Sequence, residues 1–356
     1  MSNSFLVCSD KKIESLYIKK FHLNIWEINT QYIRMECGLH FNIRKDDFRK
    51  NENIKFSLFT PFHIYKKNLS VIYQDLLNDR NINLIFNEKC SCTIDYSTQE
   101  DLPYAKLIEL GNGTKFLLVN SRLIENECDE TKIVFNVGTK DLRLEDLFKD
   151  DSIKDVDFYV RFNFRVDLNL SKNIIRGRNL STDIIIYDIR LHDLRLFKPD
   201  DIRANYDKIL DVKMFYIFVI NDVRFKPRLL DSDKFKYRRI LEKELFEPYI
   251  KELRRTHKVY TIHYWRFGDE KKNLETTNLV ISFEKEKSVR ILSTFALTMN
   301  IIVALIFSFS DTFFKIEEFY PIILIMMLTL ALILFLPPFI VRQYNNLWVS
   351  KVNRNN

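Results

Sequence analysis

The stretch FYVRFNFRVDLNL, residues 158–170, carries the clearest structural pattern in the chain. Every second residue in it is apolar: Phe158, Val160, Phe162, Phe164, Val166, Leu168 and Leu170. A period of two is the spacing of side chains on one face of a β-strand. The stretch therefore predicts a long strand with one buried face, and it places Arg161 and Arg165 together on the opposite face.

Similar but shorter patterns predict that most of the chain up to residue 284 is β-structure. Strands are expected at Phe21–Ile28, Ile33–Ile43, Ile54–Phe59, Leu84–Phe86, Cys92–Tyr96, Lys132–Val137, Asp183–Leu191, Met214–Ile220, Val259–Phe267 and Asn278–Phe283, and a hairpin at Lys106–Val119. Helices are expected only at Ser70–Asn78 and Asp233–Thr256. Many strands with few helices between them favour a mainly β body, an antiparallel sandwich or jelly roll.

Composition excludes several classes of protein. The chain has 356 residues, a net charge of +7, 46% hydrophobic and 29% charged residues, which excludes general disorder. Six Gly and eight Pro exclude collagen-like and linker-rich architectures. Five Cys argue against a disulfide scaffold and favour a reducing compartment.

Two uncharged stretches near the C-terminus have the length of membrane spans. ILSTFALTMNIIVALIFSFS occupies 291–310 and FYPIILIMMLTLALILFLPPFIV occupies 319–341. About 20 apolar helical residues cross a bilayer core, so we expect a transmembrane helical hairpin at 291–341. Flanking Lys and Arg place both termini in the cytoplasm and the protein in the inner membrane. The expected domains are a cytosolic β-rich body at 1–284, subdivided near 140–155, a linker at 285–290 and a cytosolic tail at 342–356.

Motifs for catalysis or cofactor binding are missing. The sequence contains no G-x-x-x-x-G-K-[ST], G-x-G-x-x-G, G-x-S-x-G or H-E-x-x-H motif. Cys90 and Cys92 form a close thiol pair, but zinc sites use a wider first spacing and further ligands. We therefore predict no catalytic residues, no metal site, no cofactor and no enzymatic activity.

Arg and Tyr residues instead indicate a binding site for an anionic ligand. Arg side chains bind phosphates and Tyr rings stack on bases. The expected ligand-binding residues are Tyr159, Arg161, Asn163, Arg165, Arg190, Tyr260, Tyr264 and Arg266. The alternative is an ordinary solvated face, since acidic residues such as Asp167 and Asp188 lie nearby in the sequence.

The first uncharged stretch contains a stripe of small and polar residues. Ser293, Ala296, Asn300, Ala304 and Ser308 recur every three or four positions, on one side of a helix. Such a stripe predicts either a helix–helix interface or a pore lining. Two spans cannot enclose a pore, so the partners expected are the lipid bilayer and further copies of the chain, for example in a homotetramer.

This arrangement, a cytosolic β-rich body followed by 291–310 and 319–341, resembles the two-span membrane effectors of bacterial anti-phage defence systems. These include effectors found with retrons and effectors controlled by oligonucleotides or cyclic nucleotides. The resemblance implies an oligomeric membrane effector or ion channel gated by a cytosolic ligand such as a nucleotide or oligonucleotide. The alternatives are a membrane-tethered binding or scaffold protein without a pore, and an uncharacterised membrane-bound enzyme.

Overall fold

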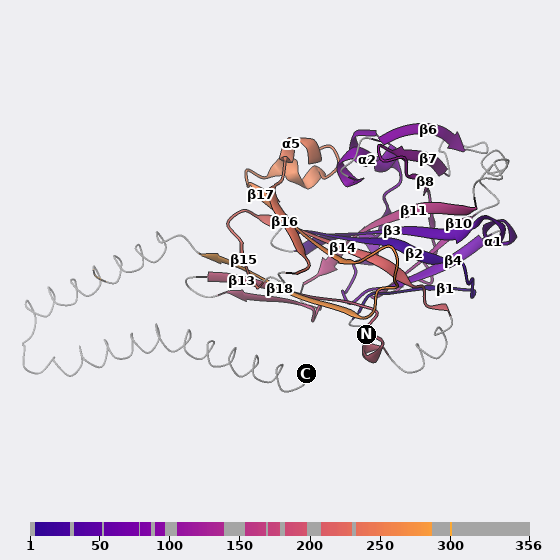
Figure 1. The fold of residues 1–356 in the computed structure, drawn as a ribbon. Helices are drawn as coiled ribbons and strands as arrows, with labels where there is room; N and C mark the ends of the chain where they lie inside the picture. The colour runs from indigo at the N-terminus through magenta and orange to yellow at the C-terminus, as the bar shows by residue number, and fades with distance from the viewer. Residues whose placement is uncertain are drawn as a thin grey trace, which may run out of the picture. The chain divides into compact units, whose positions relative to one another are not determined.

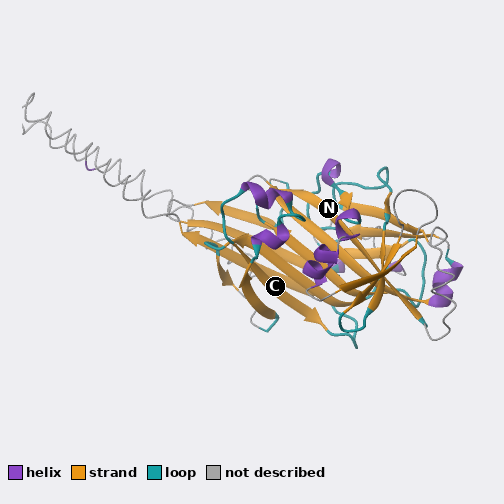
Figure 2. Cartoon of the chain, turned by 90° about the horizontal axis from the view of Figure 1, so that it is seen from above, coloured by secondary structure: helices purple, strands orange, loops and turns teal. Residues whose placement is uncertain are grey.

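The structure is a computed structural model of the full chain, and it describes residues 4–28, 32–51, 53–77, 79–86, 90–96, 105–138, 154–168, 170–178, 182–197, 208–229, 233–286 and 300. The chain divides into two compact units, Met1–Ile175 with Ile185–Phe283, and Arg176–Ile184 with Glu284–Asn356. The first unit contains the ten-stranded sheet, the four-stranded sheet that includes β1 (Leu6–Ser9), and the cavities described below. Strands dominate it, and its helices are short (Figure 2).

A ten-stranded sheet organises the first unit. Its order is β16 (Phe235–Ile240), β17 (Tyr260–Gly268), β14 (Val212–Asp222), β2 (Tyr17–Trp26), β3 (Tyr32–Arg44), β11 (Asp155–Asp167), β8 (Lys115–Val119), β7 (Ala105–Leu110) and β6 (Cys90–Tyr96), with β5 (Ser70–Val71) also paired to β11. β14 pairs with β2, and β11 with β8, in parallel; the other pairings are antiparallel. Strand β11 is the strand predicted at 158–170, shifted by three residues.

Two smaller sheets complete the strand inventory. One has the order β1 (Leu6–Ser9), β4 (Asn53–Phe59), β10 (Lys132–Gly138) and β9 (Arg122–Leu123), and the other the order β12 (Ile174–Arg178), β13 (Thr182–Leu191), β18 (Thr277–Glu286) and β15 (Lys226–Leu229). Among the described residues, the helices are α1 (Lys45–Lys50), α2 (Asp79–Phe86) and α5 (Lys243–Phe246), with 3-10 turns at Lys66–Asn68, Gln74–Leu77, Leu194–Leu196 and Lys251–Arg255.

The main core fills the space between the large sheet and the β1–β4–β10–β9 sheet. Phe41 of β3 lies 4.6 Å from Phe56 of β4 between ring centroids, and Phe135 of β10 lies 4.6 Å from Phe162 of β11. On the other side of the large sheet lie α2 and α5 (Figure 1). Strand β2 explains this division, because Phe21, Leu23 and Ile25 enter the core while the residues between them face the helices.

The structure contradicts the predicted transmembrane hairpin. Among the residues described, no helix is long and apolar enough to span a bilayer; α2, for example, has eight residues against the roughly 20 that a span needs. Apart from Asn300, the stretches 291–310 and 319–341 lie outside the described residues. We therefore take the fold class as a β protein with short helices, and the predicted membrane spans, inner-membrane localisation and pore are not retained.

Three local predictions are also wrong. Asp233–Thr256 is not a helix: its first part is strand β16, followed by α5 and a 3-10 turn. Pairing with β17 overrides helix propensity there, since Tyr237 of β16 packs on Tyr264 with ring centroids 4.8 Å apart. Leu84–Phe86 belongs to helix α2 instead of a strand, and Ser70–Asn78 forms β5 and a 3-10 turn. The predicted subdivision near 140–155 lies almost entirely outside the described residues.

Candidate anion-binding site

A cavity of about 340 Å³ opens on the face of the large sheet that α2 and α5 cover. We call it the aromatic cavity. Four neighbouring strands, two helices and single residues elsewhere line it: Lys20, His22, Asn24, Trp26, Ile85, Phe86, Leu110, Arg161, Tyr216, Phe218, Ile220, Tyr237, Arg239, Phe246, Tyr249, Ile262, Tyr264 and Arg266. Its volume lies within the range of small-molecule sites.

The strand registers arrange the lining in three rows that cross the sheet. The middle row runs Tyr237, Tyr264, Phe218, Asn24. On one side of it lies the row Arg266, Tyr216, His22, and on the other the row Arg239, Ile262, Ile220, Trp26. Successive rows are two residues apart along each strand, or about 7 Å.

Aromatic rings form one wall of the cavity. The ring of Tyr264 is nearly parallel to that of Phe218, with centroids 4.7 Å apart and an interplanar angle of 11°. It is also parallel to the ring of Tyr216, at 6.0 Å and 5°. Burial raises the pKa of Tyr264, so its hydroxyl stays neutral. These rings stack face to face on one another and form an aromatic wall of the cavity, against which a planar group can pack.

Basic side chains supply the charge of the lining. Lys20, Arg161, Arg239 and Arg266 line the cavity, and no acidic side chain is among the described residues that do so. Arg239 is held by Glu242 at 2.8 Å in an exposed pair. Arg266 lies over the ring of Tyr216, with Cζ 5.9 Å from the centroid, and its Nη2 donates to the Met214 sulfur at 3.6 Å. Among the described residues, no carboxylate pairs with Arg266.

A buried carboxylate lies behind the cavity. Glu36 of β3 is fully buried; its Oε2 accepts hydrogen bonds from Arg161 Nη2 at 2.6 Å and from the Tyr249 hydroxyl at 2.9 Å. Its Oε1 accepts from Arg34 Nε at 3.1 Å. Burial alone would raise the pKa of this carboxyl, but the charges of Arg161 and Arg34 outweigh it, so the pKa of Glu36 is lowered. Two guanidinium groups therefore share one carboxylate.

Gly38 makes room for the side chain that orients Arg161. The Tyr159 hydroxyl accepts a hydrogen bond from Arg161 Nη1 at 2.9 Å and lies 3.3 Å from His22 Nδ1. A Cβ at Gly38, between His22 and Arg161 in the register, would overlap that hydroxyl. Burial and the charge of Arg161 lower the pKa of His22 well below its usual value. His22 is therefore neutral near pH 7 and adds no charge to the cavity.

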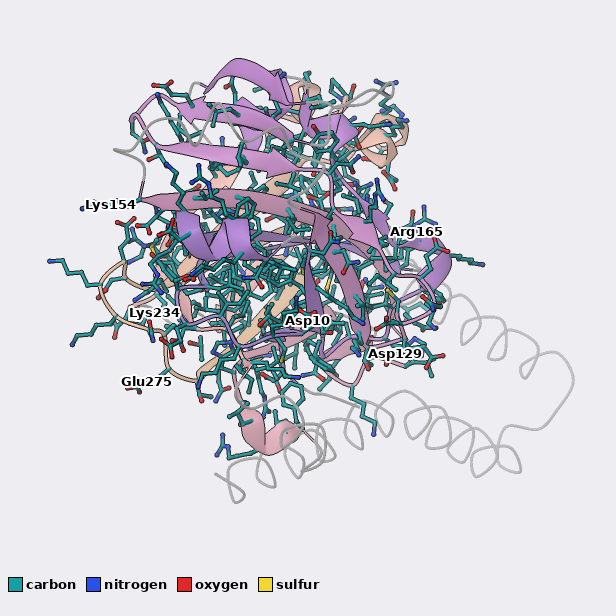
Figure 3. All side chains as sticks on the ribbon, turned by 90° about the vertical axis from the view of Figure 1, so that its right-hand side faces the viewer. Asp10, Asp129, Lys154, Arg165, Lys234 and Glu275 are labelled. Carbon is teal, nitrogen blue, oxygen red and sulfur yellow. The ribbon has the colours of Figure 1, made fainter. Side chains whose placement is uncertain are left out.

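A second cavity, of about 570 Å³, has a mixed charge. Ile28, Tyr32, Arg34, Asp75, Asn163, Arg165, Tyr249, Lys251, Glu252 and Thr256 line it. Arg165 lies over the Tyr32 ring at 4.1 Å and 3.8 Å from Glu252, near the surface of the molecule (Figure 3). Glu252 also lies 3.5 Å from Arg34. The basic groups of the second cavity are thus partly neutralised by Glu252.

The residues predicted from the sequence are distributed over several places. Tyr264, Arg266 and Arg161 line the aromatic cavity, while Asn163 and Arg165 line the second one. Tyr260 is buried against Thr256, and Arg190 of β13 is held by Asp188 at 2.7 Å; neither residue lines either of these two cavities. Arg161 is only 1% exposed, so the expected open Arg161–Arg165 face does not exist.

The predicted pore or interface stripe falls mostly on residues that the structure does not describe. Ser293, Ala296, Ala304 and Ser308 lie outside the described residues, and Asn300 is described only as helical and exposed.

Sequence reasoning missed the contributions of β2, β14 and β16. In β2 the polar residues Lys20, His22 and Asn24 alternate with core residues, a pattern that could have been found. Strand β14 carries only aromatic and aliphatic residues at Tyr216, Phe218 and Ile220, so no local signal separates its cavity face from its core face. Metal ligation finds no support, because the described part of the chain holds no group of three His, Cys, Asp or Glu able to bind an ion.

Comparisons with known proteins leave the family open. No family model and no curated protein matches the chain. Among solved structures, the Mu homology domain of Fcho1 from Danio rerio, with a bound Eps15 peptide, matches at 6% identity over 80% of this chain and 81% of that chain, with a TM-score of 0.20. A TM-score this low carries no argument. The resemblance to anti-phage effectors and the role in defence stay predictions.

Proposed function

We propose that the protein is a binding module for a small anionic ligand that carries a planar aromatic group. The observation that carries the proposal is the lining of the aromatic cavity, which combines four basic side chains with stacked rings and, among the described residues, no acidic side chain. Cations attract a phosphate and aromatic side chains pack against a base, and a nucleotide contains both groups.

Arg266 is the basic residue best suited to meet the anion. It stands beside the aromatic row, next to Tyr264 in its own strand, and contacts only a ring and a sulfur among the groups above. Arg161 is bound to Glu36 and Tyr159, so its charge is compensated behind the cavity and it is not the group that contacts the anion. A hydrogen bond to a charged group contributes about 1.5–3 kcal/mol, which is about ten- to a hundredfold in affinity.

Calorimetric titration tests this proposal with four probes. Phenyl phosphate and adenosine monophosphate should both bind more tightly than ribose 5-phosphate, which has no aromatic ring, and than uncharged adenosine. Arg266→Gln should weaken both aromatic anions by about ten- to a hundredfold. Arg190→Gln is the matched control, because Arg190 lines neither cavity, and should leave the affinities unchanged. The proposal fails if neither aromatic anion binds, or if Arg266→Gln behaves like Arg190→Gln.

A further inference from the structure

The aromatic cavity has a hydrogen-bonding end with no partner of its own. Trp26 is 2% exposed, lines the cavity, and its Nε1 has no hydrogen-bond partner among the described residues. The Oδ1 atom of Asn24 is likewise buried without a partner, and Asn24 lines the same cavity. A buried indole N–H normally finds an acceptor, and a donor left unpaired costs free energy. One donor and one acceptor are thus unused at one end of the site.

Asn24 and Trp26 lie beside the stacked aromatic rings in the sheet. Asn24 stands opposite Phe218 in the middle row, so it is next to the stacked pair of Phe218 and Tyr264. Trp26 follows two residues later on the same face of β2, about 7 Å further along. Arg266 lies on the other side of the middle row. A ring packed against this stacked pair therefore has Arg266 in the row on one side, Asn24 in the middle row and Trp26 in the row on the other side.

We propose that Trp26 and Asn24 bind the edge of a nucleobase, with Trp26 Nε1 donating to a ring nitrogen or carbonyl oxygen and Asn24 Oδ1 accepting from a neighbouring N–H. This proposal rests on the proposed function and specifies its ligand. The planar group is then a nitrogen heterocycle of the nucleobase type, whose edge offers an acceptor next to a donor. A phenyl or naphthyl ring leaves both protein groups unpaired, and a site built to hydrogen-bond its ligand discriminates against such an analogue.

The test compares three anions by titration calorimetry on the full chain. Adenosine monophosphate offers a ring nitrogen acceptor and an amino donor, its N6,N6-dimethyl derivative lacks the donor, and phenyl phosphate lacks both. The wild-type protein should bind adenosine monophosphate about tenfold more tightly than the dimethyl derivative and more tightly still than phenyl phosphate. Asn24→Leu should remove the difference between the first two ligands.

Trp26→Phe keeps an aromatic ring but removes the N–H donor together with part of the indole, so it should weaken adenosine monophosphate about tenfold more than it weakens phenyl phosphate. Thermal melts establish whether each variant is folded. If Trp26→Phe does not fold, Asn24→Leu alone provides the test. Equal wild-type affinity for all three anions would overturn this inference while leaving the proposed function intact. Failure of every aromatic anion to bind would overturn the proposed function itself.

Discussion

Replacing Glu36 by Gln is the perturbation whose effect the structure defines best. Glu36 is fully buried and accepts hydrogen bonds from Arg161, Arg34 and Tyr249. The substitution keeps the shape of the side chain and removes its charge, which leaves two guanidinium groups without their shared carboxylate. Removing one partner of a buried ion pair costs about 3–5 kcal/mol, because the remaining charge stays buried and unpaired.

Glu252→Gln is the matched control for this variant. Glu252 pairs with the same Arg34, and with Arg165, but at 3.5 and 3.8 Å and with a side chain that is 27% exposed. Pairs of this kind contribute about 0–1 kcal/mol. Guanidinium chloride unfolding, followed by far-ultraviolet circular dichroism, should therefore show that Glu36→Gln lowers the free energy of unfolding several times as much as Glu252→Gln does. Equal losses below about 1 kcal/mol would refute the account of the buried network.

The same variant has a second, opposite consequence for binding. With the carboxylate removed, the charge of Arg161 behind the aromatic cavity is no longer compensated. An anion in the cavity then meets a more positive field, so folded Glu36→Gln should bind adenosine monophosphate more tightly than the wild type. Stability and affinity should thus change in opposite directions, and weaker binding by the folded variant would contradict this.

Three further predictions concern acid, salt and backbone space. Burial lowers the pKa values of His22, His40 and His263, the last to about 4, so below pH 6.5 the unfolded chain binds more protons than the folded one. The free energy of unfolding should therefore fall as the pH is lowered from 6.5 to 5, by up to about 1.4 kcal/mol per pH unit for each His. Chemical denaturation at pH 7.5, 6.5 and 5.5 measures this loss, and a free energy of unfolding that does not change with pH would contradict the prediction. Gly38→Ala should lower the free energy of unfolding by about 1–3 kcal/mol, because the new Cβ overlaps the Tyr159 hydroxyl. In a Tyr159→Leu background the same substitution should lower it by less. An equal loss in both backgrounds, measured by chemical denaturation, would contradict that contact. Raising the salt concentration should weaken binding of adenosine monophosphate, as calorimetry at two salt concentrations checks, and salt-independent binding would argue against the charged lining.

Alternation along the chain made the long strands predictable and left their partners hidden. The period-two pattern around Phe158 gave β11 to within three residues, because one face of that strand enters the core. The same pattern could not show that Glu36 lies across from Asn163 in the register and neutralises Arg161. That pairing joins residues more than 100 positions apart, so a strand face expected to bind an anion is instead closed by an internal ion pair.

The cavity was only partly predictable for the same reason. Tyr264 and Arg266 were identified because Arg and Tyr side chains suit an anionic ligand, and both line the cavity. Their neighbours Tyr216 and Phe218 come from β14, which pairs with β2 in parallel, and no turn or local motif in the sequence indicates that pairing. The helix expected at Asp233–Thr256 also hid the contribution of Tyr237 to the cavity, because contact between Tyr237 and Tyr264 favours a strand there.

A crystal structure of the full chain with adenosine monophosphate tests the central claim most directly. We predict density for the base against the rings of Tyr264 and Phe218, with its edge toward Asn24 and Trp26 and its phosphate at Arg266. Density for the nucleotide at another place on the protein, with the aromatic cavity left empty at saturating ligand, would contradict the account.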